Sequence, residues 1–133
     1  MKSRALAAAA VVALITISLV SCGSSAASGG NASAATIPAN ATAITAIDGI
    51  AWDAKSYVAT AVDGKVTITA KNDSTLPHNL HLIDAESVDV GVSLTITNRG
   101  AVDTKSILLA PGTYQVICTI AGHGNMKATL TVK

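Results

Sequence analysis

The sequence predicts an all-β domain over residues 47–133, a Greek-key β-sandwich or barrel of about seven or eight strands. Three observations support this fold class. Apolar and polar residues alternate in several short runs, which is typical of strands with one buried face. Turn signals rich in Gly, Pro, Asn and Asp recur between these runs. No helical periodicity of useful length appears in this part of the sequence.

The first predicted strands form a hairpin. Residues 65–71 alternate between polar and apolar types, and Asp63-Gly64 immediately before them is a turn signal. We therefore expect residues 57–62 to be the antiparallel partner of residues 65–71.

The remaining strands follow the same pattern. Residues 92–97 alternate and end at a turn signal at 98–100, and residues 107–109 lead into another turn at 110–112. The last two strands each place four apolar side chains on one face. These are Tyr114, Val116, Cys118 and Ile120, and then Met126, Ala128, Leu130 and Val132.

The N-terminal 21 residues read as a secretory signal peptide. Lys2 and Arg4 precede an uncharged, apolar run over residues 5–20, and small residues follow it. The run has 16 residues, whereas a membrane-spanning helix needs ~20. Cleavage is therefore favoured over the alternative of an uncleaved anchor.

Residues 19–22, Leu-Val-Ser-Cys, resemble a bacterial lipobox. The resemblance implies that Cys22 is the first mature residue and is lipidated on its sulfur, so that the protein is exported and anchored at the extracytoplasmic face of a membrane, as in the periplasm. The alternative is an ordinary signal peptide with a chance cysteine. Residues 22–46 are rich in Ser, Ala, Gly, Asn and Thr, and this composition predicts a flexible linker.

The charge pattern gives no sign of a polyanionic partner. Without residues 1–21 the chain keeps seven basic and eight acidic side chains, with no block of like charge. We therefore expect no nucleic-acid binding and no electrostatic attraction to anionic lipids. We expect a monomer.

The two cysteines are Cys22 and Cys118, which lies 96 positions later in a strand pattern. A disulfide between them is a minor alternative. A lone thiol in an oxidising compartment needs another explanation, and metal ligation is the obvious candidate.

Soft and imidazole ligands gather in two segments. One contains His78, and the other contains Cys118, His123 and Met126 within nine residues. Two imidazoles, one thiolate and a weak thioether are the ligand set of a blue copper site. Structural zinc sites favour four strong ligands, and hard cations need carboxylate oxygens that this cluster lacks. A two-copper centre would need a second cysteine in the cluster.

These two segments resemble the copper-binding segments of the cupredoxins. The match lies in residues 112–123, Gly-Thr-Tyr-Gln-Val-Ile-Cys-Thr-Ile-Ala-Gly-His, and in Pro77-His78-Asn79. The resemblance spans residues 57–133. The spacing from Cys118 to His123 is similar to that of azurin and rusticyanin, and the spacing from His123 to Met126 is that of amicyanin. The combination is a departure, as is Ala121, where many relatives have proline.

The resemblance implies a single-electron carrier with one copper ion held by His78, Cys118, His123 and Met126. A backbone carbonyl is the alternative weak ligand. Asn79 would tie the two copper segments together without binding the metal, and redox partner proteins would dock near His123. His81, three positions from His78 on a strand, should point to the opposite face and serve a structural role.

Three other functions are considered. A copper carrier or reservoir that delivers the metal to another envelope protein would need the same ligands. A copper oxidase or nitrite reductase would need a second copper site with additional histidines, and His81 alone remains. We therefore do not expect an enzyme. A binding module that has lost its metal is disfavoured, because all four ligands are present.

Overall fold

The computed structural model describes residues 35–133, which form nine strands in two sheets. The predicted signal peptide and Cys22 lie outside these residues, as does most of the predicted linker. The strands are β1 (Ala41–Ile47), β2 (Ala51–Trp52), β3 (Ser56–Ala59), β4 (Lys65–Asn72), β5 (His78–Ile83), β6 (Asp89–Ile96), β7 (Val102–Leu108), β8 (Gly112–Ile117) and β9 (Lys127–Val132). Within residues 35–133, no helix is long and apolar enough to cross a bilayer.

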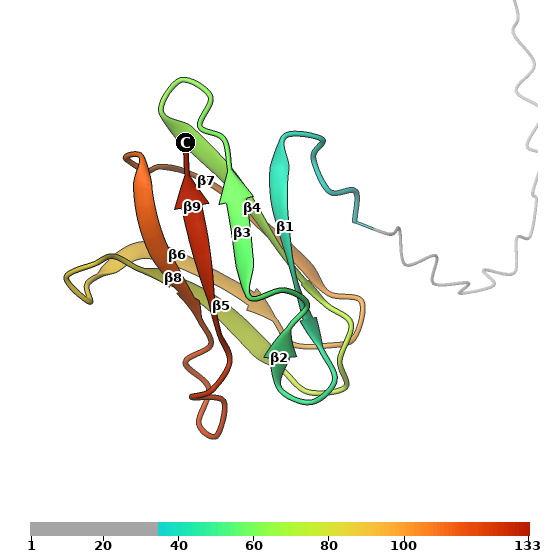
Figure 1. Cartoon of the computed structure of the whole chain (residues 1–133). Coiled ribbons are helices and arrows are strands. Elements are labelled where there is room, and N and C mark those ends of the chain that lie inside the picture. The colour runs from blue at the N-terminus through green and yellow to red at the C-terminus, as the bar shows by residue number, and fades with distance from the viewer. Residues whose placement is uncertain (1–34) are drawn as a thin grey trace, which may run out of the picture. The chain divides into compact units, whose positions relative to one another are not determined.

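The two sheets pack face to face as a β-sandwich, which confirms the predicted fold class (Figure 1). The first sheet has the order β2-β1-β4-β7, and the second has the order β3-β9-β8-β5-β6. Most neighbouring strands are antiparallel, but β1 pairs in parallel with β4, and β3 pairs in parallel with β9. Strands that are distant in the sequence therefore lie next to each other in both sheets.

The predicted hairpin between residues 57–62 and 65–71 is wrong. Asp63 and Gly64 do form a tight turn, in which Val62 and Lys65 exchange two backbone hydrogen bonds, and both turn residues have positive φ. Beyond this bridge the two arms separate, because β3 joins β9 in one sheet whereas β4 lies between β1 and β7 in the other. The turn therefore carries the chain from one layer of the sandwich to the other.

The predicted linker over 22–46 also ends too late. β1 begins at Ala41 and pairs with β4 from Ala41↔Thr67 to Ala46↔Asn72. Its Ile44 and Ala46 side chains are fully buried. The Ala- and Thr-rich composition of this segment continues that of the linker, and only pairing with a distant strand makes it part of the sheet.

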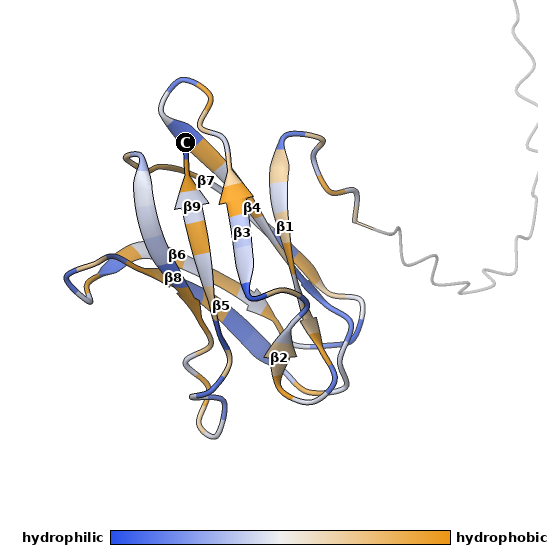
Figure 2. Ribbon diagram, in the orientation of Figure 1, coloured by the Kyte–Doolittle hydropathy of each residue, from blue (hydrophilic) through white to orange (hydrophobic). Residues whose placement is uncertain are grey.

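The core consists of the inward-facing residues of both sheets, as the alternating pattern predicts. Hydrophobic and hydrophilic residues alternate along β9 in Figure 2, and Ala128, Leu130 and Val132 are its buried members. Tyr114 packs in the core and donates its hydroxyl hydrogen to the carbonyl oxygen of Ala110 at 2.9 Å. Through this bond Tyr114 braces a corner of the sandwich.

One end of the sandwich collects the predicted ligand segments. The loop between β8 and β9 lies at the end of the molecule opposite the C-terminus (Figure 1), and the Ile117↔Lys127 pair closes the sheet beneath it. The connection from β4 to β5, which ends at His78, reaches the same region, because β5 pairs with β8. The fold thus brings residues about 40 positions apart in the sequence to one place.

Candidate metal centre

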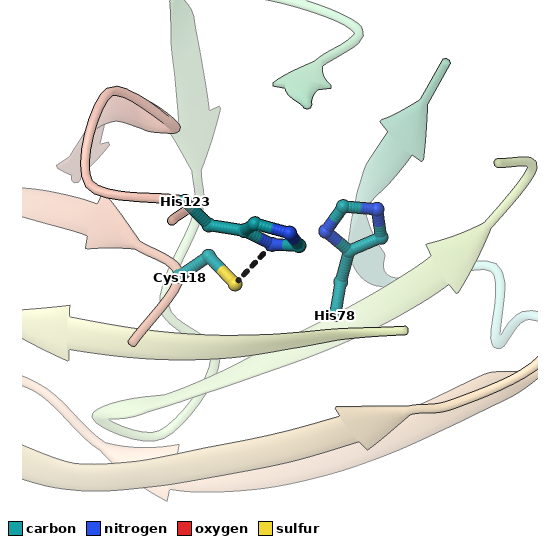
Figure 3. A group of neighbouring side chains, drawn as sticks. All are labelled: His78, Cys118 and His123. Carbon is teal, nitrogen blue, oxygen red and sulfur yellow. Dashed lines mark hydrogen bonds between the residues drawn. The ribbon is translucent and has the colours of Figure 1, made fainter. Parts of the chain in front are cut away.

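His78, Cys118 and His123 converge on a common point. One potential ligand atom from each lies within 4.8 Å of the other two, and all three side chains are buried. Figure 3 shows them pointing toward one another, His78 from the start of β5 and the other two from the loop after β8. The imidazole rings of His78 and His123 have centroids 4.8 Å apart, and Cys118 Sγ lies 3.4 Å from His123 Nδ1.

Two consecutive turns explain the spacing of Cys118, His123 and Met126. His123 N–H donates to the carbonyl oxygen of Ile120 at 3.0 Å, and Met126 N–H donates to that of His123 at 2.8 Å. Each turn spans four residues, so His123 both ends the first turn and begins the second. Gly122 occupies the third position of the first turn with φ +87°, a conformation that favours glycine. The loop thereby returns to the sheet within nine residues.

The base of this loop is closed by main-chain and side-chain bonds. Cys118 N–H donates to the carbonyl oxygen of Met126 at 3.3 Å. The same oxygen accepts a hydrogen bond from Trp52 Nε1 at 3.2 Å, and this bond is buried. Trp52 lies in β2 of the opposite sheet, so it holds the ligand loop against the other layer. No pattern in the sequence indicates this contact, and the sequence analysis did not predict it.

Met126 lies directly before β9 with a side chain that is only 1 % exposed. It therefore packs inside the sandwich at the end of the second turn. Ligation by Met126 stays a prediction.

Asn79 links the two ligand segments. Its Nδ2 donates to Thr119 Oγ1 at 2.7 Å, and its Oδ1 accepts from Thr119 N–H at 2.8 Å. Because Asn79 follows His78 and Thr119 follows Cys118, this two-point contact holds the backbones of two candidate ligands at a set separation. The contact involves neither the His78 imidazole nor the Cys118 thiol.

The segment before His78 holds a buried polar cluster that sequence reasoning missed. Asn72 and Ser74 are at most 1 % exposed, although both are polar. Ser74 Oγ lies 2.8 Å from His78 Nε2 and 2.9 Å from Asn72 Oδ1. An asparagine two residues before a serine is a signal for a local turn, but not for a contact with an imidazole four residues further on.

Burial lowers the pKa of His78 below its ordinary value of 6.5, and the nearby His123 lowers it further. The buried imidazole is therefore neutral at neutral pH, as a metal ligand must be. Among residues 35–133, no Asp or Glu side chain joins the three-residue group. The site is thus a buried cluster of nitrogen and sulfur donors.

His81 faces away from this cluster, as predicted. Burial alternates along β5, with His78, Leu80 and Leu82 buried and the residues between them partly exposed. His81 Nδ1 lies 2.7 Å from Asp89 Oδ2, and its Nε2 lies 3.5 Å from Ser93 Oγ. His81 therefore forms a hydrogen bond with Asp89 of β6 on the outer face of the sheet.

The donor set fits a single copper ion better than the other common metals. Nδ1 of His78 is buried and has no hydrogen-bond partner among the described residues. A buried nitrogen without a partner is costly unless something else satisfies it, and a metal ion would do so. Two imidazoles and one thiolate, with only a thioether or a carbonyl to add, are typical of copper and lack the fourth strong donor that zinc favours.

The chain matches no known family model, and no curated protein resembles it at a significant level. Solved structures do resemble it. Auracyanin from Roseiflexus castenholzii superposes with a TM-score of 0.59 at 23% identity, over 73% of this chain and 99% of that one. Auracyanin A, a blue copper protein from Chloroflexus aurantiacus, gives 0.58 at 21% identity, over 70% of this chain and 98% of that one.

An azurin from Methylomonas sp. strain J gives a TM-score of 0.59 at 16% identity, over 72% of this chain and 99% of that one. Each of these proteins is matched over nearly its whole length by part of this chain. All of them are cupredoxins. Residues 35–133 therefore adopt the cupredoxin fold.

Proposed function

We propose that this chain is a single-electron carrier that holds one copper ion through His78, Cys118 and His123, with Met126 as a weaker fourth ligand. The observation that carries the proposal is the buried convergence of two imidazoles and one thiol within 4.8 Å. A copper ion bound there would alternate between Cu(I) and Cu(II). The chain contributes a ligand set that is buried and held by hydrogen bonds, so that little rearrangement accompanies each change of charge.

The rigidity of the ligands supports electron transfer rather than chemistry on a substrate. Asn79 and Thr119 join the two ligand segments, and Trp52 holds the loop at Met126. An enzyme of this copper class would need a second copper site with additional histidines. His81 is the remaining histidine of the chain, and it is paired with Asp89. We propose no enzymatic activity.

We propose His123 as the point where electrons leave, and a partner protein that docks around it. His123 is 7 % exposed, whereas His78 is 1 % exposed. The neighbouring residues Ala121, Gly122 and Gly124 are exposed and uncharged. Leu76, which lies two positions before His78 in the sequence, is 42 % exposed. A small apolar surface of this kind suits the weak, brief complexes of redox proteins.

A visible spectrum tests the copper proposal directly. The purified domain with one equivalent of Cu(II) should be strongly blue or green, because the thiolate of Cys118 bonds the metal. Cys118→Ser should abolish the colour, whereas the matched surface change Thr113→Ser should keep it. A wild-type protein that binds Cu(II) without an intense visible band would contradict the proposal.

Copper delivery is the alternative function, and it uses the same ligands. The nearly complete burial of all three side chains favours retention of the metal over rapid release. Transfer to a competing chelator distinguishes the two functions. An electron carrier should hold copper for hours, and a delivery protein should release it within seconds to minutes.

We propose that the protein is exported and anchored to a membrane by a lipid on Cys22. This rests on the signal-like residues 1–21 and on the lipobox-like residues 19–22. The polar residues between Cys22 and β1 would then form a tether that reaches about 25 Å. The mass of the mature protein is the test, because signal cleavage and lipidation together change it by a defined amount. A mature protein that keeps residues 1–21, or that has an unmodified Cys22, would contradict this part.

A further inference from the structure

We infer that Ser74 is a positioning residue, which places the proton of His78 on Nε2 and so leaves Nδ1 ready to bind the metal. The inference rests on the proposed function. It starts from the cluster of Asn72, Ser74 and His78, in which none of the three residues is more than 1 % exposed. With so little access to water, each polar hydrogen must find its acceptor within the protein.

The orientation of the Asn72 amide follows from its neighbours. Its Nδ2 lies 2.8 Å from the carbonyl oxygen of Leu76 and 2.9 Å from that of Ile96. Its Oδ1 lies 2.9 Å from the backbone N–H of Ser74. Reversal of the amide would set oxygen against two carbonyl oxygens and NH₂ against an N–H group. Oδ1 therefore faces Ser74, and it can only accept.

The single hydrogen of the Ser74 hydroxyl bears on the direction of the hydrogen bond between Ser74 and His78. Oγ lies 2.9 Å from Asn72 Oδ1 and 3.1 Å from the carbonyl oxygen of Leu76, and both of these atoms are acceptors only. Oγ also accepts from Leu76 N–H at 3.2 Å. With its hydrogen directed to an acceptor, Oγ keeps one lone pair for the remaining neighbour, His78 Nε2 at 2.8 Å. In this arrangement Nε2 carries the proton and donates it to Oγ.

The other tautomer is unfavourable on two counts. It would place a hydrogen on Nδ1, which is buried and has no partner among the described residues. It would also draw the Ser74 hydrogen away from Asn72 Oδ1. The Nε2–H form instead leaves a lone pair on Nδ1, the nitrogen that borders Cys118 and His123 (Figure 3). The ring is thus oriented before the metal arrives.

The first test needs no metal. In the metal-free protein at pH 8, ¹⁵N-resolved NMR of the imidazole rings should show His78 protonated on Nε2 and bare on Nδ1. Ser74→Ala should remove this preference and give a mixture of the two tautomers. A proton on Nδ1 in the wild-type protein would overturn the inference.

The second test measures Cu(I) affinity by competition with a chelator. Ser74→Ala should weaken binding about 10-fold, as expected for the loss of a hydrogen bond to a ligand. Ser74→Thr, which keeps the hydroxyl, should restore most of the affinity. The matched control is Ser93→Ala, since Ser93 Oγ also lies beside a histidine Nε2, at 3.5 Å from His81. The control should change neither the tautomer of His78 nor the affinity.

The outcomes separate the two proposals. If Ser74→Ala binds Cu(I) within twofold of the wild type, Ser74 does not position the ligand, whatever the function of the site. If the wild type shows the Nε2 proton but binds no copper, the proposed function is wrong and the tautomer assignment stands.

Discussion

His78 and His81 lie three positions apart on the same strand, and their surroundings differ in burial and in the partner of Nδ1. His78 faces the interior, is 1 % exposed, and has a buried Nδ1 without a hydrogen-bond partner. His81 faces outward, and its Nδ1 is engaged by the carboxylate of Asp89 at 2.7 Å. The two rings therefore offer different chemistry, although both belong to β5.

The difference indicates which of the two rings could bind a metal ion. Both imidazoles have a serine hydroxyl near Nε2, Ser74 for His78 and Ser93 for His81. The two rings differ at Nδ1. Nδ1 of His78 has no hydrogen-bond partner and lies near the Cys118 thiol, whereas Nδ1 of His81 is bound to the carboxylate of Asp89. Of these two rings, only His78 has an Nδ1 that the protein leaves without a hydrogen-bond partner, as the proposed ligation requires.

The largest expected effect comes from removing each ring in turn. His78→Ala should abolish the intense visible band of the Cu(II) form, because it deletes one of three strong donors. His81→Ala should leave the band and the Cu(I) affinity within about twofold of the wild type. Absorption spectra and chelator competition measure both. Loss of the band in His81→Ala would show that the two rings are not functionally separate.

Asn79 sharpens the comparison, because its side chain lies on the same outer face as that of His81 and yet serves the ligand segments. Asn79→Ala removes both hydrogen bonds to Thr119. At about 1 kcal/mol for each net hydrogen bond, unfolding should become easier by ~1–2 kcal/mol. Copper affinity should fall by about 10- to 100-fold. Denaturant unfolding of the metal-free protein and chelator competition are the measurements, and unchanged affinity would contradict the predicted role.

The pH dependence of the metal-free protein tests the buried ring. The folded pKa of His78 lies below its unfolded value of 6.5, so His78 stays neutral in the native state while the unfolded chain takes up a proton. The free energy of unfolding is therefore unaffected by protonation of His78 above pH 6.5. It decreases as pH falls from 6.5 toward the folded pKa, by up to about 1.4 kcal/mol per pH unit. Urea unfolding between pH 7.5 and 5 measures the slope. His78→Ala should flatten it, and His81→Ala serves as the control.

Asp89→Asn should have the smallest effect. A hydrogen bond from His81 lowers the pKa of Asp89 below its usual 3.8. The resulting stabilisation is present above pH 3.8 and is lost as pH falls through the lowered pKa. Because the carboxylate is 43% exposed, water screens the pair, and its loss should cost less than about 1 kcal/mol at pH 7. A larger loss, or any change in the copper spectrum, would show that the outer pair affects the site.

Local patterns in the sequence predicted much of the fold. The alternation in residues 92–97 and 126–132 matches β6 and β9, because side chains of a strand alternate between core and solvent wherever the strand pairs. The hairpin at Asp63-Gly64 was wrong, since a turn signal does not say whether its two arms stay in one sheet. β1 was missed, because its pairing with β4 depends on a strand more than 20 positions away.

The types of the candidate ligands follow from residue identity and from the spacing of the two turns, which set the donors that one loop can present. His78, Cys118 and His123 could be selected in this way, and the structure brings them together. Which nitrogen of His78 is left without a partner, and which polar groups hold its ring, depends on how the two sheets pack. Ser74 and Trp52 act through hydrogen bonds, and a hydrogen bond depends on distances of about 3 Å that only the packed sandwich sets.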